Sequence, residues 1–419
     1  MIKTVSFKTI GCRLNQAETA HIAGQFNAAG YRIVPFGKTC DICVIHTCAV
    51  THKAEKDSAR IARSVKRSNE DCFVILTGCA VETGGKKLLS ESSADIVINQ
   101  SNKFKLLELI AETPTLQHSN TPYSHTVILP HFSTTRALVK VQDGCDFRCA
   151  YCIVPFTRGS SKSRPFQEIL DEVNKLVDTG FREVVLTGAN LGCYEYNNKH
   201  LVDLIHRIES THIDRIRLSS IELSTTERAI IEYMTQSEKL CRYIHLPLQS
   251  GDNNTLRLMK RKYTISEYRQ LIDYAVEKIP FLGIGTDIIV GFPGENDTAF
   301  GNTLSMVREL PFSNLHVFPY SKRPGTRAET MKDQVSEKDK KQRTSDLINI
   351  GAEKKKSFAV KFLKKKVSVL IEKISNDCAA GWTSEYVKAK IRGSNIKPNR
   401  IIEFTPSKYD GETLQGTLS

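Results

Sequence analysis

The N-terminal part of the chain alternates short apolar runs with longer amphipathic stretches. The apolar runs have the length of strands and fall at residues 5–10, 42–46, 72–76 and 95–98. Between them, apolar side chains recur at helical spacing within residues 16–29 and 54–66. Strands that alternate with helices are typical of an open parallel sheet. The pattern therefore predicts an α/β domain at the N-terminus.

A second alternation of strands and helices occupies the middle of the chain. Six strands are expected at residues 137–141, 183–186, 216–219, 243–246, 284–290 and 315–318. Amphipathic helices are expected around Ile169, Val173 and Leu176, and at residues 201–208, 227–234, 267–276 and 298–310. Strands and helices in this order predict a partial (β/α)6 barrel, a fold in which chemistry takes place at the C-terminal strand ends.

The C-terminal part changes to short segments in which apolar and polar residues alternate. These segments lie at residues 366–372, 386–391 and 400–404 and predict a small β-barrel.

A stretch without periodicity separates the first two patterns. Residues 112–136 are rich in Ser, Thr, His and Pro, so we interpret them as a linker. His118, His125 and His131 are then linker residues rather than ligands. We therefore expect three domains, at residues 1–112, 131–360 and 361–419.

Composition and charge narrow the class of protein. Of the 419 residues, 40% are apolar, and no apolar run approaches the length of a membrane span. The first residues show no secretion signal, so we expect a reducing cytoplasm, where the twelve cysteines are metal ligands or buried thiols. A formal charge of +13 favours a polyanionic partner such as nucleic acid, although a solvated basic surface would give the same charge.

Three closely spaced cysteines follow the first strand of the predicted barrel. Cys145, Cys149 and Cys152 have the spacing C-x3-C-x2-C and offer three thiolates to a metal centre that needs four ligands. A structural zinc site would close its shell with a nearby fourth Cys or His, but the next cysteine is Cys193, which has no partner beside it. The spacing therefore predicts a metal centre with one position left to a ligand that is not protein.

Three other cysteines share one position in the predicted N-terminal sheet. Cys12, Cys48 and Cys79 each come just past the C-terminal end of a strand. Open parallel sheets bind ligands outside those ends, where residues distant in sequence converge. These cysteines are candidates for a second metal centre, with ordinary buried thiols as the alternative.

The remaining cysteines lack this arrangement. Cys40 and Cys43 resemble a C-x2-C pair, but Cys43 lies inside a predicted strand, where side chains three apart point to opposite faces. The pair is therefore not expected to chelate one ion. We expect packing or structural roles for the other cysteines, which are Cys72, Cys193, Cys241 and Cys378.

The order of the motifs resembles that of the radical S-adenosylmethionine methylthiotransferases, over essentially the whole chain. The motifs that carry the resemblance surround or follow the six cysteines and occupy residues 9–15, 46–50, 76–80, 145–159, 245–251, 287–295 and 318–326. Residues 50–54, the basic run after them and residues 76–78 are most similar to the bacterial branch that modifies threonylcarbamoyladenosine beside the tRNA anticodon.

The resemblance implies a radical reaction. Cys145, Cys149 and Cys152 would hold a 4Fe-4S cluster whose open iron binds S-adenosylmethionine, and a low-potential electron donor would drive its cleavage. The resulting 5′-deoxyadenosyl radical would abstract hydrogen from carbon 2 of the target adenine. Tyr151 matches the aromatic position just before the third cysteine that the superfamily places near the bound adenine, with packing of the loop as the alternative. No further catalytic residue is assigned.

The resemblance also implies a sulfur source and an RNA-binding module. Cys12, Cys48 and Cys79 would hold an auxiliary 4Fe-4S cluster that presents the sulfur to be inserted, and a second S-adenosylmethionine would supply the methyl group. The C-terminal segment resembles the TRAM domain, whose basic residues would follow RNA phosphates, with a purely structural cap as the alternative.

Two departures and two rival activities remain open. His46 stands where the family usually has asparagine, and residues 80–83 replace a commoner continuation after Cys79. The sibling activities are methylthiolation of isopentenyladenosine in tRNA or of an aspartate on a ribosomal protein. A non-catalytic iron-sulfur protein that binds RNA or transfers electrons is the alternative from another class, against which the barrel loops and the open iron position argue.

Overall fold

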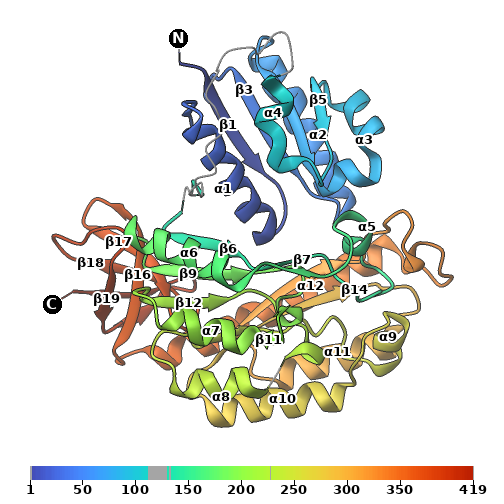
Figure 1. Cartoon of the computed structure of the whole chain (residues 1–419). Coiled ribbons are helices and arrows are strands. Elements are labelled where there is room, and N and C mark those ends of the chain that lie inside the picture. The colour runs from blue at the N-terminus through green and yellow to red at the C-terminus, as the bar shows by residue number, and fades with distance from the viewer. Residues whose placement is uncertain (1, 112–129, 132–133, 227, 419) are drawn as a thin grey trace. The chain divides into compact units, whose positions relative to one another are not determined.

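The computed structural model, drawn in Figure 1, describes residues 2–111, 130–131, 134–226 and 228–418. The chain divides into two compact units. Unit 1 comprises Met1–Ser133, Asp143–Lys162 and Ser321–Glu329, and unit 2 comprises Thr134–Gln142, Ser163–Tyr320 and Thr330–Ser419. Segments that are distant in the sequence therefore build each unit.

Unit 1 contains a parallel sheet with the order β2-β1-β3-β4-β5. Its strands are β1 (Thr4–Thr9), β2 (Arg32–Ile33), β3 (Ile42–Thr47), β4 (Phe73–Gly78) and β5 (Ile96–Ile98). Its helices are α1 (Arg13–Ala28), α2 (His52–Ser68), α3 (Cys79–Ser92), α4 (Leu106–Ala111) and the short α5 (Val154–Thr157). The expected open parallel sheet is confirmed.

Helices cover both faces of this sheet because its central strand is apolar on both sides. In β3, Ile42 and Val44 pack in one cluster with Phe26 of α1, and Ile45 packs in another with Ala62 of α2. The sequence pattern did not predict α3, whose helical geometry is interrupted at Gly84.

Unit 2 contains six parallel barrel strands in sequence order. They are β6 (Arg136–Lys140), β9 (Glu183–Thr187), β12 (Arg215–Leu218), β13 (Tyr243–His245), β14 (Gly283–Val290) and β15 (Asn314–Pro319). They form two sheets, β12-β9-β6 and β13-β14-β15, which backbone bridges connect at Ile216–Leu240 and Ser220–His245. The partial barrel is confirmed, and each expected strand agrees with an observed one within one or two residues.

Amphipathic helices connect the barrel strands. They are α6 (Phe166–Asp178), α7 (Leu201–Glu209), α8 (Arg228–Gln236), α9 (Asn253–Leu258), α10 (Ile265–Lys278) and α11 (Asp297–Glu309), followed by the long α12 (Glu337–Ala359). Two minor two-stranded sheets join β7 (Gln142–Asp143) to β8 (Lys162–Ser163) and β10 (Glu195–Tyr196) to β11 (Lys199–His200).

The C-terminal segment folds into a curled mixed sheet, drawn in orange and red in Figure 1, whose strand pairs are antiparallel except for one parallel pair. Its strands, in the spatial order β19-β16-β17-β18-β21-β20, are β16 (Val367–Ser375), β17 (Cys378–Thr383), β18 (Lys388–Arg392), β19 (Ile401–Phe404), β20 (Lys408–Tyr409) and β21 (Leu414–Thr417). The pattern missed β17, because Ala-Ala-Gly in its middle does not alternate. Gly381 is required there, since a Cβ atom would lie 1.9 Å from the carbonyl oxygen of Leu370.

The turn between β17 and β18 closes the barrel at the starting ends of its strands. Arg217 of β12 donates hydrogen bonds to the carbonyl oxygens of Thr383 (3.1 Å) and Ser384 (3.0 Å) and to the carboxylate of Glu183. A Cβ atom at Gly283, the first residue of β14, would lie 2.4 Å from the carbonyl oxygen of Glu385. The turn therefore does not occupy the C-terminal ends of the strands, where the loops of barrel enzymes carry out chemistry.

Among the described residues, no helix has both the length and the apolar character needed to cross a membrane.

Candidate active site

Three cysteines of unit 1 follow three neighbouring strands. Cys12, Cys48 and Cys79 come after β1, β3 and β4, which are adjacent in the sheet. Thr47 pairs with Gly78, so Cys48 and Cys79 each lie one residue beyond the last paired position. Cys12 precedes α1, and Cys79 is the first residue of α3. The parallel register thus places the three thiols at one edge of the sheet.

Two glycines allow the backbone to pack tightly at this edge. Gly11 has a φ of +105°, and a Cβ atom there would lie 2.9 Å from Sγ of Cys48. Gly78 has a φ of +99°, and a Cβ atom there would lie 2.4 Å from the ring of His46. A side chain at Gly11 would clash with Cys48, and one at Gly78 would clash with His46, so both glycines are needed for the observed backbone.

The thiols at this edge interact electrostatically. The pKa of Cys48 is raised to about 11, chiefly by burial, while a hydrogen bond from the backbone of Val50 and the positive charge of Arg158 act in the opposite direction to burial, Cys12 and Cys79. Burial also raises the pKa of Cys79. A cation among the three sulfur atoms would favour their thiolate form, so this donor set could hold a metal centre.

The second set of cysteines lies in a tightly turned loop that also belongs to unit 1. The backbone N–H of Cys145 donates to the carbonyl oxygen of Gly159 at 3.0 Å, and that of Cys152 donates to Cys149 at 3.1 Å. Gly144 has a φ of +66°, and a Cβ atom there would lie 2.0 Å from the carbonyl oxygen of Ser160. The loop therefore depends on this glycine.

The side chains of the loop remain partly accessible. Cys145, Cys149, Tyr151 and Cys152 are all half-buried. Ile153, the next residue, is buried in the cluster that also holds Cys79. The two sets of three cysteines thus belong to one compact unit, although more than sixty residues of sequence separate Cys79 from Cys145.

A buried carboxylate accompanies the two cysteine sets. Glu18 of α1 accepts two hydrogen bonds from Arg158, at 2.9 and 3.0 Å. It also forms an ion pair with Lys103 at 2.5 Å, and Nε2 of His46 lies 3.5 Å from its carboxylate. Arg158 also donates to Asn15 at 2.6 Å. Sequence reasoning assigned no role to Glu18 or Arg158. The sequence held one signal for Glu18, because this glutamate falls among the buried residues of α1 and a buried carboxylate needs a partner.

The contacts around Glu18 show how a histidine is accommodated at position 46, where the family usually has asparagine. The imidazole is fully buried, with Nδ1 3.0 Å from the hydroxyl of Thr19 and Nε2 facing Glu18. The hydrogen bond at Nδ1 and the carboxylate near Nε2 offset part of the desolvation of the histidine.

Other residues singled out from the sequence lie apart from these sets. Sγ of Cys40 is 3.1 Å from the hydroxyl of Ser6 and 3.8 Å from Sγ of Cys72. The backbone N–H of His131 donates to the carbonyl oxygen of Ala20 at 2.8 Å. His118 and His125 lie outside the described residues.

Two family models match different parts of the chain. Residues 139–307 match the radical SAM superfamily, and residues 4–99 match an uncharacterized protein family, UPF0004. The match to the first family includes the loop of Cys145, Cys149 and Cys152, and the match to the second includes Cys12, Cys48 and Cys79.

Curated relatives match nearly the full chain. The threonylcarbamoyladenosine tRNA methylthiotransferase MtaB of Bacillus subtilis is 35% identical, over 96% of this chain and 93% of the relative. The protein of the same name from Aquifex aeolicus is 34% identical, over 88% and 92%. A tRNA-2-methylthio-N(6)-dimethylallyladenosine synthase from Thermodesulfovibrio yellowstonii is 31% identical, over 99% of both chains.

A solved structure supports the fold. The radical S-adenosylmethionine methyltransferase TsrM from Kitasatospora setae, solved with cobalamin and a [4Fe-4S] cluster, has a TM-score of 0.57 at 13% identity, covering 78% of this chain and 77% of that one. Radical SAM enzymes combine S-adenosylmethionine with a [4Fe-4S] cluster, for which sulfur ligands are required. With relatives that match almost end to end, this chain belongs to the family of radical S-adenosylmethionine tRNA methylthiotransferases.

Proposed function

We propose that this enzyme attaches a methylthio group to carbon 2 of the adenine of threonylcarbamoyladenosine, next to the anticodon of tRNA. Two 4Fe-4S clusters and two molecules of S-adenosylmethionine would serve each reaction. The observation that carries the proposal is the presence of two sets of three cysteines in one compact unit. Each set leaves one metal position for a ligand that is not protein.

Cys145, Cys149 and Cys152 would hold the cluster that binds S-adenosylmethionine. Their loop fits this role because its backbone turns tightly while its thiols stay accessible. Tyr151, half-buried between Cys149 and Cys152, would contact the bound cofactor.

Cys12, Cys48 and Cys79 would hold the auxiliary cluster. These three sulfur donors fit a cluster, because they lie at one edge of the sheet and interact electrostatically. The missing side chain of Gly11 leaves room for Sγ of Cys48 beside the backbone of Gly11. When bound, the two clusters supply an electron for cleavage of S-adenosylmethionine and the sulfur for insertion.

The residues around the cysteines would favour their ligating form. Arg158 and the backbone N–H of Val50 both lower the pKa of Cys48, against the effect of burial. The bidentate contact with Glu18 holds Arg158 in place and offsets the cost of burying its charge.

Basic side chains would bind the tRNA. Helix α2, which follows Cys48, exposes five cationic residues, namely Lys53, Lys56, Arg60, Arg63 and Arg67. The C-terminal sheet, in a domain we assign to residues 361–419, would add RNA contacts through its own basic residues. We assign residues 1–112 to the auxiliary-cluster domain and 131–360 to the radical SAM core.

The setting follows from the cofactors. A reducing cytoplasm would keep the twelve cysteines available as metal ligands or buried thiols. A low-potential electron donor would be the second partner beside tRNA.

The substrate assignment rests on the higher identity to the threonylcarbamoyladenosine enzymes, 32–35% against 31–32% for the dimethylallyladenosine synthases. Mass spectrometry of tRNA nucleosides from a strain lacking the gene tests it. We expect loss of the methylthio group from threonylcarbamoyladenosine and its return on complementation. If that nucleoside kept its methylthio group while the dimethylallyl nucleoside lost it, the sibling substrate would replace ours.

A second assay separates the roles of the two cysteine sets. Reduced, cluster-loaded protein with S-adenosylmethionine should release 5′-deoxyadenosine. Cys145→Ala should abolish this product, whereas Cys12→Ala should keep releasing it without methylthiolating tRNA. Equal loss of 5′-deoxyadenosine in both variants would contradict the division of labour.

A further inference from the structure

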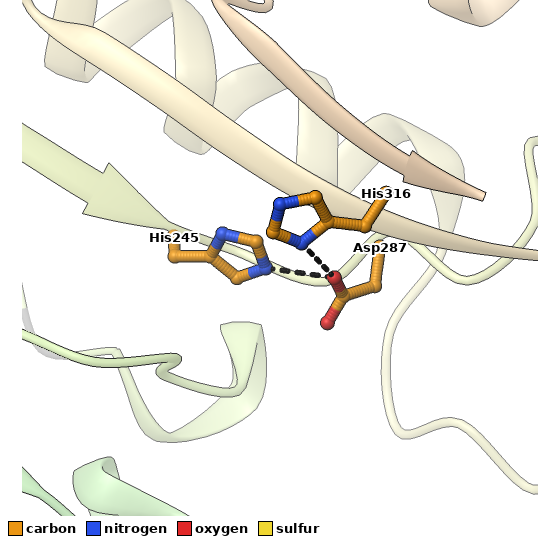
Figure 2. Close-up of side chains that lie close together, drawn as sticks. All are labelled: His245, Asp287 and His316. Carbon is orange, nitrogen blue, oxygen red and sulfur yellow. Dashed lines mark hydrogen bonds and ion pairs between the residues drawn. The ribbon is translucent and has the colours of Figure 1, made fainter. Parts of the chain in front are cut away.

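Three side chains that the proposed reaction leaves unassigned meet within unit 2. Figure 2 shows His245, Asp287 and His316 pointing toward one another from β13, β14 and β15. Oδ1 of Asp287 lies 3.0 Å from Nε2 of His245 and 3.1 Å from Nδ1 of His316. One ligand atom from each residue lies within 4.8 Å of the other two. Two imidazole nitrogens and a carboxylate oxygen therefore converge.

The strand register produces this arrangement. His245 pairs with Gly285 and His316 pairs with Asp287, and residues two apart on a strand share a face. The other face of β14 carries Thr286, whose hydroxyl lies 3.4 Å from the hydroxyl of Tyr268 on α10. The three side chains thus occupy the strand face that is turned away from α10.

Outer partners hold both imidazoles in orientation. The hydroxyl of Tyr243 lies 3.3 Å from Nδ1 of His245, and the amide of Asn314 lies 3.0 Å from Nε2 of His316. Histidine ligands of metals usually donate their second N–H to an acceptor, and the hydroxyl of Tyr243 can accept from His245 in this way. Asn314 presents its amide nitrogen, which is a donor, so its amide group must turn over to accept from a metal-bound His316. Gly285 makes room for the first contact, since a Cβ atom there would lie 2.0 Å from the hydroxyl of Tyr243 and 2.6 Å from Nδ1 of His245.

The group is closed on one side and open on the other. The exposed fraction of the side chain rises from 7% for His245 to 24% for Asp287 and 48% for His316. An ion would therefore reach the carboxylate of Asp287 from the side of His316.

We propose that His245, Asp287 and His316 bind a divalent transition-metal ion. Two histidines and one carboxylate are the ligand set of mononuclear zinc and iron sites that keep open positions, whereas magnesium and calcium prefer oxygen ligands. Ligand atoms about 3.3 Å apart surround a tetrahedral ion at about 2.0 Å, so outward shifts of a few tenths of an ångström would admit it. The open positions would take water or an anionic oxygen of a bound substrate.

Zinc binding to the full-length, cluster-loaded protein tests the proposal under anaerobic conditions. After incubation with Zn²⁺ and gel filtration, the wild type should retain one more zinc per chain than Asp287→Asn or His316→Gln. His206→Gln is the matched control, because His206 is an exposed histidine of the same unit that belongs to no such group among the described residues. His316 is half exposed, so its variant should fold and keep both clusters.

X-ray absorption at the zinc edge distinguishes this site from zinc that has displaced iron at cysteines. We expect nitrogen and oxygen ligands at about 2.0–2.1 Å and no sulfur at about 2.3 Å. Tyr243→Phe keeps all three ligands and should weaken zinc binding about 10-fold or more through loss of the outer partner. Equal zinc content in all variants, or a shell of sulfur alone, would show a hydrogen-bonded triad without a metal.

Discussion

The guanidinium of Arg158 donates two parallel hydrogen bonds to the carboxylate of Glu18, from Nη1 to Oε1 at 2.9 Å and from Nη2 to Oε2 at 3.0 Å. Arg158 follows the loop that carries Cys145, Cys149 and Cys152, and Glu18 lies on the helix that begins after Cys12. The two side chains are nearly inaccessible to water, with exposed fractions of 2% and 0%. This ion pair therefore ties the two cysteine sets to each other within unit 1.

Arg158→Lys should destabilise the protein strongly, because a lysine cannot reproduce the bidentate contact with a buried carboxylate. We expect a loss of about 3 kcal/mol in the free energy of unfolding, measured by urea denaturation. The matched control is Arg182→Lys, which alters an ion pair with Asp214 at 3.1 Å whose side chains are 37% and 41% exposed. That change should cost less than about 1 kcal/mol. Equal costs for the two variants would argue against a special role for the buried pair.

Gly144→Ala should remove one cluster and leave the other. A Cβ atom at Gly144 would lie 2.0 Å from the carbonyl oxygen of Ser160, so the loop of Cys145 must move. Gly159→Ala is the control, because Gly159 also has a positive φ, +75°, but open space where its Cβ atom would be. Iron analysis after reconstitution should find about half the wild-type iron in the first variant and nearly all of it in the second. Full iron content with Gly144→Ala would refute the predicted dependence.

Reversing two charges on α2 should weaken tRNA binding. Lys53→Glu/Lys56→Glu changes two exposed lysines on the helix after Cys48. We expect at least about a tenfold rise in the dissociation constant and a salt dependence whose slope falls by about one for each phosphate that the variant no longer binds. Lys86→Glu/Lys87→Glu makes the same change in charge on α3 of the same unit. If both variants weaken binding equally, net charge rather than α2 explains the affinity.

Cys40 should react with a small alkylating reagent at a lower pH than an ordinary thiol. Hydrogen bonds from Cys72 and Ser6 lower its pKa despite burial, and Cys40 lines a cavity of about 150 Å³. Because the thiolate is the reactive form, labelling should be substantial below pH 8, whereas Cys43, whose pKa burial raises to about 11, should stay unlabelled. Peptide mass spectrometry across a pH series measures both sites.

A variant isolates the cause of this reactivity. Cys72→Ala removes the contact that lowers the pKa of Cys40 most and should move its labelling curve to higher pH. An unchanged curve would show that the contact with Cys72 does not set the pKa of Cys40.

Local periodicity was sufficient to predict much of the fold. The strand expected at residues 284–290 is β14 (Gly283–Val290), and the helix expected at 267–276 is α10 (Ile265–Lys278). Each of these elements buries one face, so apolar residues recur along it at the spacing of a strand or a helix. Helix α3 escaped prediction because two glycines interrupt its pattern, and β21 because its four residues are too few to show one.

The candidate cysteines were also accessible from the sequence. Cys48 and Cys79 were assigned together because parallel strands end at the same edge of a sheet, and β3 and β4 are indeed adjacent. The spacing of Cys145, Cys149 and Cys152 is local and needs no tertiary information.

The sequence by itself determined the strand and helix order, the two sets of cysteines and the family resemblance, because each is recorded in short-range spacing or in motif order. Only the tertiary structure decided which charged side chains meet. Glu18 and Arg158 are separated by 140 residues, and Asp287 meets His316 only through strand register. Such contacts depend on how elements pack across a sheet or barrel, and the spacing of residues along one chain carries no record of that packing.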